Sequence, residues 1–384
     1  MVTFKSLIAG CVGIGASNMT FSTQTSPIAA HRQKRVGTAY NYWTTKAWGA
    51  NLGNWLILEK WMDGSIFKKY APHANDEWTF AQQASNPSAA LTEHWNNWIT
   101  ENDFKILASV NANHVRIPVG YWAFIKPDAG EPYVSTGQKA QIERILSYCD
   151  TYNLYAIIDL HGLPGSQNGE AHSGHIGPID FYSDYNIQRG IKTVQAIVDW
   201  MNGLSSNLKA RIASIEAANE PRVSGDQLNT LKYFYTQAFN IIDASEFKVP
   251  MMFHDAFQGL DAWNNFLPAP ANAVIDLHPY YAFPPKNDKI SIINCICNTK
   301  LSASSFHLPV LFGEWSLGSG VPSDDTWLRQ MMDTQVAVYK ESGAGGIFWA
   351  LKNNINSSVW SFEQLVSEGI INSGTFSHHT NAQY

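Results

Sequence analysis

The amino-acid sequence predicts an α/β protein that folds as a single (β/α)8 TIM barrel. Short apolar runs alternate with longer amphipathic stretches, which is the pattern of βα units that build a parallel sheet. There are eight such runs, and eight units close naturally into a barrel. The chain has 384 residues, 45% of them hydrophobic, and no Pro/Ser-rich linker divides it. One domain with a large core is therefore expected.

The eight apolar runs are the predicted strands. They span residues 48–58, 114–119, 155–160, 214–220, 250–257, 273–280, 309–316 and 345–352. Helical patterns lie between them, most clearly over residues 140–153, 228–245 and 325–342. Each of these three stretches is apolar at i, i+3 and i+4, so each is suited to covering one face of the sheet.

Polar and aromatic residues gather at the carboxyl ends of seven predicted strands. In chain order they are Arg116, Asp159 with His161, Asn219 with Glu220, His254 with Asp255, His278 with Tyr280, Glu314 with Trp315, and Trp349. A single strand-end residue of this kind usually satisfies loop backbone. Because a barrel brings all its strand ends to one face, where the active sites of this fold lie, seven together predict a functional site.

Composition and motifs exclude several classes of function. A net charge of −6, with no basic cluster beyond residues 32–35, argues against nucleic acid or an anionic membrane as partner. The chain has no Gly-x-Ser-x-Gly elbow, His-Glu-x-x-His helix or glycine-rich nucleotide fingerprint. His161, His172 and His175 are close in sequence, but the last two lie in a Gly/Ser-rich loop without a positioned carboxylate ligand. Neither a metal nor another cofactor is expected.

Two glutamates among aromatic and neutral hydrogen-bonding groups suit cleavage of a glycosidic bond. One carboxyl group protonates the leaving oxygen, and in retaining enzymes the other attacks the anomeric carbon. Glu220 and Glu314 are the prominent candidates. Asn219 can bond the sugar 2-hydroxyl, Arg116 and Tyr280 can keep Glu314 ionised, and Trp349 offers a flat apolar face.

Pro221 follows Glu220 directly. Since proline disfavours the α region for the residue before it, Glu220 is expected to have an extended backbone that directs its side chain out of the strand.

Several segments between Trp48 and Phe362 match one known family. They read NLGNWLILEKWM, HWNNWITENDFKILAS, NHVRIPVGYWAF, IDLHGLPGSQNG, NEP, GEWS and IFWALK. Together they resemble the fungal exo-β-1,3-glucanase branch of glycoside hydrolase family 5. The resemblance implies a secreted retaining β-glycosidase on a (β/α)8 barrel, with Glu220 as acid/base and Glu314 as nucleophile. It also implies substrate-binding or supporting roles for Glu59, Arg116, His161, Asn219, His278, Tyr280, Phe283 and Trp349.

The chain departs from this branch around the site. Glu170 stands where the branch has an aromatic residue that clamps the next sugar, and Ala171 and His172 replace an aspartate and an asparagine. Phe283 still matches the second clamp residue. After Gly-Glu-Trp-Ser, a long insertion of the branch is missing, and the chain passes directly into a predicted helix.

Three functions are consistent with these observations. The first is an exo-acting glucan 1,3-β-glucosidase that releases glucose from non-reducing ends of an oligosaccharide. The second is a diglycosidase of the related fungal rutinosidase type, which releases a disaccharide from flavonoid glycosides. The third, which two intact glutamates disfavour, is a carbohydrate-binding barrel without catalysis. The protein is expected to act as a monomer.

The first residues predict processing in the secretory pathway. Residues 1–16 read as a secretion signal, too short to span a membrane, and residues 17–35 as a pro-segment that ends at the dibasic pair Lys34-Arg35. The catalytic barrel is then residues 36–384, secreted and either free or associated with the cell wall. Asn356 begins an Asn-Ser-Ser glycosylation sequence. Among Cys149, Cys295 and Cys297, one disulfide and one free thiol are expected, with Cys295 or Cys297 as one partner.

Overall fold

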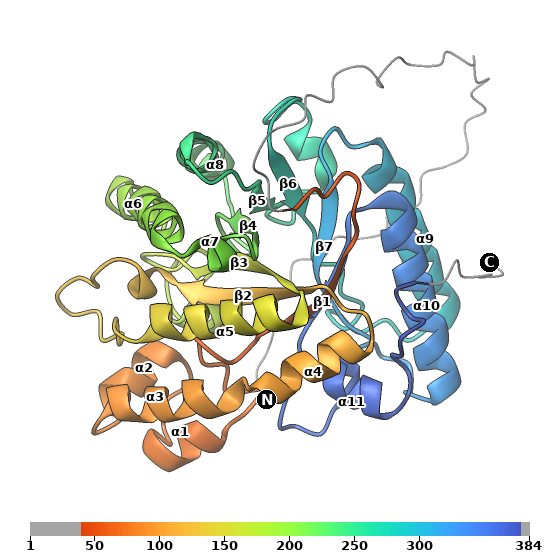
Figure 1. Ribbon diagram of the computed structural model, residues 1–384, viewed down its shortest axis with the longest axis horizontal. Coiled ribbons are helices and arrows are strands. Elements are labelled where there is room, and N and C mark those ends of the chain that lie inside the picture. The colour runs from red at the N-terminus through yellow and green to blue at the C-terminus, as the bar shows by residue number, and fades with distance from the viewer. Residues whose placement is uncertain (1–39, 378–384) are drawn as a thin grey trace.

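A computed structural model describes residues 40–377 of the chain. Eight parallel strands follow one another in sequence order and close into a barrel, which confirms the predicted (β/α)8 fold (Figure 1). The strands are β1 Ala47–Asn51, β2 His114–Gly120, β3 Tyr155–Gly162, β4 Ile212–Glu216, β5 Met251–His254, β6 Ala273–Asp276, β7 Val310–Trp315 and β8 Gly345–Phe348. The secretion signal and pro-segment predicted for residues 1–35 lie outside the described residues.

Each predicted strand overlaps an observed one, but five of the predicted ranges, 48–58, 214–220, 250–257, 273–280 and 345–352, run three or more residues past the end of the strand. The run 48–58 leaves the sheet after Asn51, and the run 214–220 leaves it after Glu216. In both cases the apolar residues that follow are buried beneath loops at the carboxyl end of the barrel rather than in the sheet. Asn219 and Glu220 are therefore loop residues, held by a turn and not by strand pairing.

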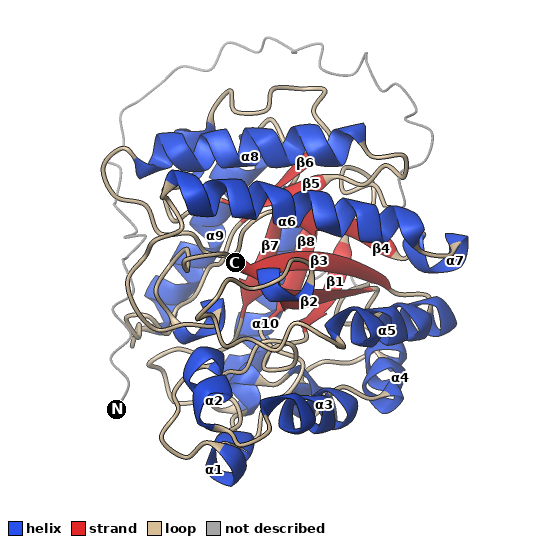
Figure 2. Ribbon diagram, turned by 90° about the vertical axis from the view of Figure 1, so that its left-hand side faces the viewer, coloured by secondary structure: helices blue, strands red, loops and turns tan. Residues whose placement is uncertain are grey.

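Helices surround the barrel on its outside (Figure 2). They are α1 Ser65–Tyr70, α2 Glu77–Gln83, α3 Pro87–Trp98, α4 Glu101–Ser109, α5 Gln138–Tyr152, α6 Asp184–Gly203, α7 Ser206–Lys209, α8 Gln227–Ala244, α9 Lys289–Ser305, α10 Asp325–Ser342 and α11 Phe362–Ser367. The three predicted helical stretches correspond to α5, α8 and α10. Helix α10 begins where expected because the carboxylate of Asp324 accepts the backbone N–H of Trp327 at 2.9 Å, satisfying a donor at the helix start.

The amino-terminal end of the barrel is filled by apolar side chains. Tyr40 and Tyr42, just before β1, pack there with Ile157, Met252 and Ile347. The hydroxyl of Tyr42 lies 3.0 Å from Ser214 Oγ, which ties the segment to β4. Because this end is a closed core, the polar residues at the opposite, carboxyl end are the ones available to a substrate.

The disulfide expected among the three cysteines does not form. Cys149 is a buried free thiol on α5, and Cys297 is a free thiol on α9. Cys295 and Cys297 are two positions apart on one helix, where side chains point to nearly opposite sides and cannot bridge. No disulfide therefore joins two of these three cysteines, which corrects that part of the prediction, but Cys295 is disulfide-bonded, as one of the two predicted alternatives had it.

Two expectations about the surface fall within the described residues. Asn356 is exposed in the loop after β8, where a glycan could be attached, and its glycosylation remains a prediction. No helix of residues 40–377 is both long and apolar enough to cross a membrane.

Candidate active site

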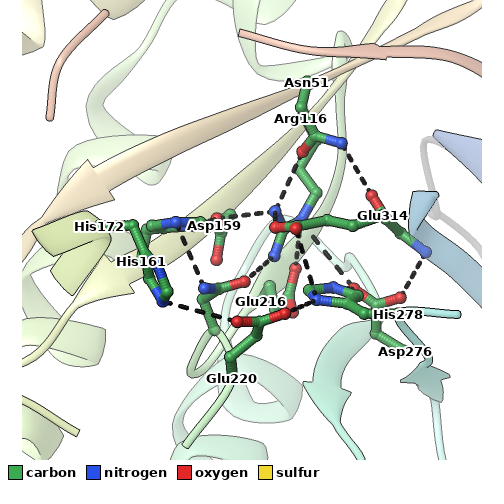
Figure 3. A network of polar contacts seen from close by, with 12 residues as sticks. Asn51, Arg116, Asp159, His161, His172, Glu216, Glu220, Asp276, His278 and Glu314 are labelled. Atoms are coloured by element: carbon green, nitrogen blue, oxygen red, sulfur yellow. Dashed lines mark hydrogen bonds and ion pairs between the residues drawn. The ribbon is translucent and has the colours of Figure 1, made fainter. Parts of the chain in front are cut away.

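Arg116 lies at the centre of a buried polar network at the carboxyl end of the barrel (Figure 3). Its side chain comes from β2 and is fully buried. Nε lies 2.7 Å from Glu216 Oε2, and Nη1 lies 3.1 Å from Asp159 Oδ2 and 2.9 Å from Glu314 Oε1. Nη2 donates to Asn219 Oδ1 at 2.8 Å. One guanidinium thus organises four side chains from three strands, β3, β4 and β7, or the loop that follows β4.

Glu314, at the end of β7, accepts hydrogen bonds from the two donors that the sequence predicted. The hydroxyl of Tyr280 donates to Oε2 at 2.9 Å, and Arg116 donates to Oε1 at 2.9 Å. Burial raises the pKa of Glu314 and nearby Glu220 adds to that shift, while His278 and Arg116 oppose it. The contacts are as expected, but burial outweighs their effect on the pKa of the carboxyl.

Glu220 lies beside two histidines. Oε1 is 2.7 Å from His278 Nδ1, and Oε2 is 3.5 Å from His172 Nε2. Burial disfavours a charge on Glu220, but the hydrogen bond and the charge of His278 hold its pKa well below the usual range. Glu220 is also less enclosed than Glu314, with 15% of its side chain exposed against 6%. This difference fits a group that meets the leaving part of a substrate.

The backbone of Glu220 is not extended, so that expectation is wrong. Its φ is +43°, a left-handed conformation that costs a residue with a side chain about 1–3 kcal/mol. Hydrogen bonds from the loop after β3 hold this turn: Asn168 Nδ2 donates to the carbonyl of Glu220 at 3.3 Å, and Arg222 N–H to the carbonyl of Gln167 at 3.0 Å. Tertiary contacts therefore override the local preference of a residue before proline.

His278 connects the two glutamates. Besides its contact with Glu220, its Nδ1 lies 3.6 Å from Glu314 Oε2, and its Nε2 lies 3.2 Å from Asp276 Oδ2. Burial disfavours the imidazolium, but Glu314 and Asp276 raise the pKa of His278 well above its usual value. His278 and Arg116 are thus the two cations that balance the buried carboxylates of this network.

His161, Asn219 and Trp349 are placed together, as the resemblance implied. His161 Nδ1 lies 2.6 Å from Asp159 Oδ2, and Asn219 Nδ2 lies 3.3 Å from His161 Nε2. The Trp349 and His161 rings are stacked, with centroids 5.7 Å apart. The amide of Asn219 is therefore fixed between Arg116 and His161.

Glu59 and an aromatic row border the site on the side of β1, β6 and β8. Trp61 Nε1 donates to Glu59 Oε2 at 2.9 Å, and burial raises the pKa of Glu59 to about 7. The ring of Trp61 meets that of Trp360 at 5.9 Å, and Trp360 stacks on Phe283 at 5.7 Å. The sequence reasoning missed Trp61 and Trp360. Trp61 could have been predicted from its position, two residues after Glu59.

Other strand-end residues do not reach this site. Trp315 is buried beneath α10, where its ring meets Tyr339 at 5.5 Å. Asp255 satisfies the turn after β5 by accepting the backbone N–H groups of Phe257 and Gly259. His175 stacks on Trp78 of α2 at 4.3 Å. Trp315, Asp255 and His175 therefore pack the core or support loops, and do not contact the two glutamates.

Two groups of side chains within residues 40–377 have a spacing that could hold a metal ion, but their chemistry does not suit one. The first comprises Glu220, His254 and His278. The backbone N–H of Ala256 donates to His254 Nδ1 at 2.9 Å, so the proton of a neutral His254 is on Nε2, the atom that would have to bind the ion. The second comprises Glu216, Asp276 and His278, whose carboxylates already face Arg116.

A (β/α)8 barrel with two close glutamates and an aromatic border at its carboxyl end is typical of a glycoside hydrolase. Comparison with known proteins gives its family. Residues 73–355 match the model of the cellulase family, glycosyl hydrolase family 5, and the chain belongs to this family.

Several fungal proteins are similar to this chain over most of its length. The chain is 31% identical to glucan 1,3-beta-glucosidase 1 of Schizosaccharomyces pombe, over 88% of this chain and 90% of that protein. It is 35% identical to a probable glucan 1,3-beta-glucosidase A of Emericella nidulans, over 78% and 73%. The crystal structure of a rutinosidase from Aspergillus niger superposes with a TM-score of 0.80 at 24% identity, over 87% of this chain and 99% of that one, which shows the shared fold.

Proposed function

We propose that this glycoside hydrolase cleaves β-glycosides with retention of configuration, using Glu314 as nucleophile and Glu220 as acid/base. The observation that carries the proposal is the position of His278 Nδ1, 2.7 Å from one glutamate and 3.6 Å from the other. One oxygen of each carboxyl group therefore lies within about 6.3 Å of the other, which favours the roughly 5–5.5 Å separation of retaining enzymes over the roughly 6.5–9.5 Å of inverting ones.

The reaction proceeds in two displacements. Glu314 attacks the anomeric carbon while Glu220 gives its proton to the leaving oxygen, which forms a glycosyl ester on Glu314. Glu220, now ionised, takes a proton from water as that water attacks the same carbon and releases Glu314. In this mechanism Asn219, which contacts Arg116 and His161, bonds the sugar 2-hydroxyl, and Glu59 bonds hydroxyls further from the scissile bond.

Glucose release from β-1,3-linked glucan is the substrate proposal that the relatives support. Both are named as glucan 1,3-beta-glucosidases, and they cover most of the chain at 31% and 35% identity. In this proposal the enzyme is secreted and acts on non-reducing ends.

Release of a disaccharide is a second candidate, favoured by the aromatic row Trp61, Trp360 and Phe283. These rings lie next to Glu59 and Tyr280, and Tyr280 contacts Glu314. The connection from β7 to α10 is short, residues 316–324. Flat rings there offer stacking faces to a second sugar attached to the one that is cleaved.

Glu220→Ala is expected to slow substrates with poor leaving groups by about 10²–10⁴-fold and to affect good ones much less, since only proton donation is removed. The measurement is kcat/KM of glycosylation on phenyl and 2,4-dinitrophenyl β-glucosides. Equal losses on both would show that Glu220 has a structural role instead. Asp180→Ala, in the loop before α6, is a control that should leave the ratio unchanged.

Product analysis separates the two substrates. Laminarin and rutin are incubated with the enzyme in parallel, and the released sugars are identified by chromatography. We expect glucose from laminarin for the first candidate and intact rutinose from rutin for the second. An enzyme that releases neither, and hydrolyses no aryl β-glycoside at mildly acidic pH, would contradict both.

A further inference from the structure

We propose that Glu170 and Arg222 bind hydroxyl groups of a sugar leaving group, and so determine which leaving groups the enzyme accepts. The inference rests on the proposed function, because it takes Glu220 as the acid/base. Glu170 Oε1 lies 2.8 Å from Arg222 Nη1, and the two side chains are 27% and 32% exposed. This ion pair therefore faces solvent, unlike the fully buried contacts of Arg116 with Asp159 and Glu216.

Two loops bring the ion pair next to the carboxyl group of Glu220. Arg222 follows Glu220 by two residues, and its backbone N–H donates to the carbonyl of Gln167 at 3.0 Å. Glu170 precedes His172 by two residues, and His172 Nε2 lies 3.5 Å from Glu220 Oε2. Burial is the largest cause of the lowered pKa of His172, and the charge of Arg222 adds to it, so the guanidinium lies near this ring.

The leaving group must lie on the same side of Glu220 as the ion pair. Oε1 of Glu220 faces His278 and, beyond it, Glu314, while Oε2 faces His172 (Figure 3). In the proposed mechanism the nucleophile attacks the anomeric carbon opposite the leaving oxygen, and the acid lies within hydrogen-bond reach of that oxygen. The leaving group therefore extends from Glu220 away from Glu314, toward the partly exposed ion pair.

A carboxylate beside a guanidinium suits the hydroxyl groups of a sugar. A guanidinium carries five N–H donors and a carboxylate two acceptor oxygens, so one contact between them does not use them all. A hydroxyl group both donates and accepts, and neighbouring sugar hydroxyls can bond to Arg222 and Glu170 together. A leaving group without hydroxyls would cover the two charges without replacing their bonds to water, which is unfavourable. Glu170 stands where the resembled branch has an aromatic residue, so hydrogen bonding takes the place of stacking there.

The test uses the trapped glycosyl-enzyme, because an acceptor that reactivates it must occupy the leaving-group site. 2,4-Dinitrophenyl 2-deoxy-2-fluoro-β-glucoside should form this species on Glu314, seen as an increase in protein mass. Recovery of activity is then followed at rising concentrations of methyl β-glucoside, a sugar acceptor, and of benzyl alcohol, which has no hydroxyl besides the one that reacts. Each acceptor gives a saturation constant, and the ratio of the two constants reports recognition of the additional hydroxyls.

Arg222→Met removes the donors, and Glu170→Leu removes the acceptors. In each variant we expect the saturation constant for methyl β-glucoside to rise about tenfold relative to that for benzyl alcohol, which is the loss of one hydrogen bond to a charged group. Arg222→Lys keeps a charged donor and should restore part of the difference. The matched control is Arg211→Met, which breaks the partly exposed pair of Arg211 and Asp150 before β4 and should leave the ratio at its wild-type value.

Several results would overturn the inference. A ratio that is unchanged in Arg222→Met and Glu170→Leu would do so, and an equal rise for both acceptors would show that the pair only supports the turn at Glu220. Failure of methyl β-glucoside to reactivate the wild type would also contradict it. Melting temperatures show whether each variant folds, and either one alone decides the question. The proposed function fails separately, if no glycosyl-enzyme forms on Glu314; a normal glycosyl-enzyme with an unchanged ratio refutes only the role of the ion pair.

Discussion

Glu314→Ala is expected to lower kcat on 2,4-dinitrophenyl β-glucoside by about 10⁴-fold or more, because the glycosyl-enzyme can no longer form. In the proposed mechanism the remaining carboxyl, Glu220, acts on the leaving group and cannot replace Glu314. Azide should restore part of the lost activity, since a small anion fits the space that the carboxylate leaves. The product identifies the role: attack from the face of Glu314 gives an α-glycosyl azide, which NMR distinguishes from the β form.

The matched control for this experiment is Glu220→Ala, in which Glu314 is intact. There azide attacks the glycosyl ester from the opposite face and should give the β-glycosyl azide. Exchange of the two products between the variants would reverse the assigned roles. Retention of wild-type kcat by Glu314→Ala would refute the mechanism altogether.

Arg116→Met is expected to lower the free energy of unfolding by about 3–5 kcal/mol, because removing one partner leaves buried charges uncompensated. Asp159, Glu216 and Asp276 are fully buried and lie within 3.9 Å of the guanidinium. In the wild type, burial already raises the pKa of Glu216 despite Arg116, whereas His278 and Arg116 hold the pKa of Asp276 below its usual value. Without the guanidinium both pKa values rise. A carboxyl group whose folded pKa lies above the unfolded value of about 4 stabilises the fold below that pH and loses the contribution as the pH rises. The difference in the free energy of unfolding between wild type and variant should therefore shrink toward pH 4 and grow toward pH 7.

Urea unfolding of wild type and Arg116→Met at several pH values measures this deficit. Arg211→Met is the control, because Arg211 pairs with Asp150 at 2.9 Å while both side chains remain partly exposed. Arg211→Met should lower the free energy of unfolding by about 1 kcal/mol or less. A deficit for Arg116→Met that does not change between pH 4 and 7 would mean that lost packing, and not charge, explains it.

The fold was predictable because its signal is local and repeated. Each strand is a short apolar run, and stretches such as 325–342 show the helical period, so eight repeats indicate a barrel without any knowledge of contacts. The limits of the strands were less predictable. The runs through Leu52 to Leu58 and Ala217 to Ala218 remain buried after they leave the sheet, so hydrophobicity does not mark where pairing stops.

The site was predictable in part, for a similar reason. Glu220 and Glu314 stand out because each follows an apolar run at a position that a barrel directs to one face. Glu216 and Asp276 were not singled out, although both contact Arg116, because the predicted runs continued to residues 220 and 280, whereas these two carboxylates are the last residues of β4 and β6. Only closure of the sheet gives these inward carboxylates a common cation.

By itself, the sequence determined the barrel, the pair of glutamates and the groups on either side of them, since these depend on residue types and their order. The tertiary structure decided how those groups act. It placed His278 between two carboxylates from different strands, gave Glu220 a left-handed backbone against the preference of a residue before proline, and set His172 beside it. Such contacts join segments far apart in the chain, and their energies depend on burial and distance, which no local pattern of residues contains.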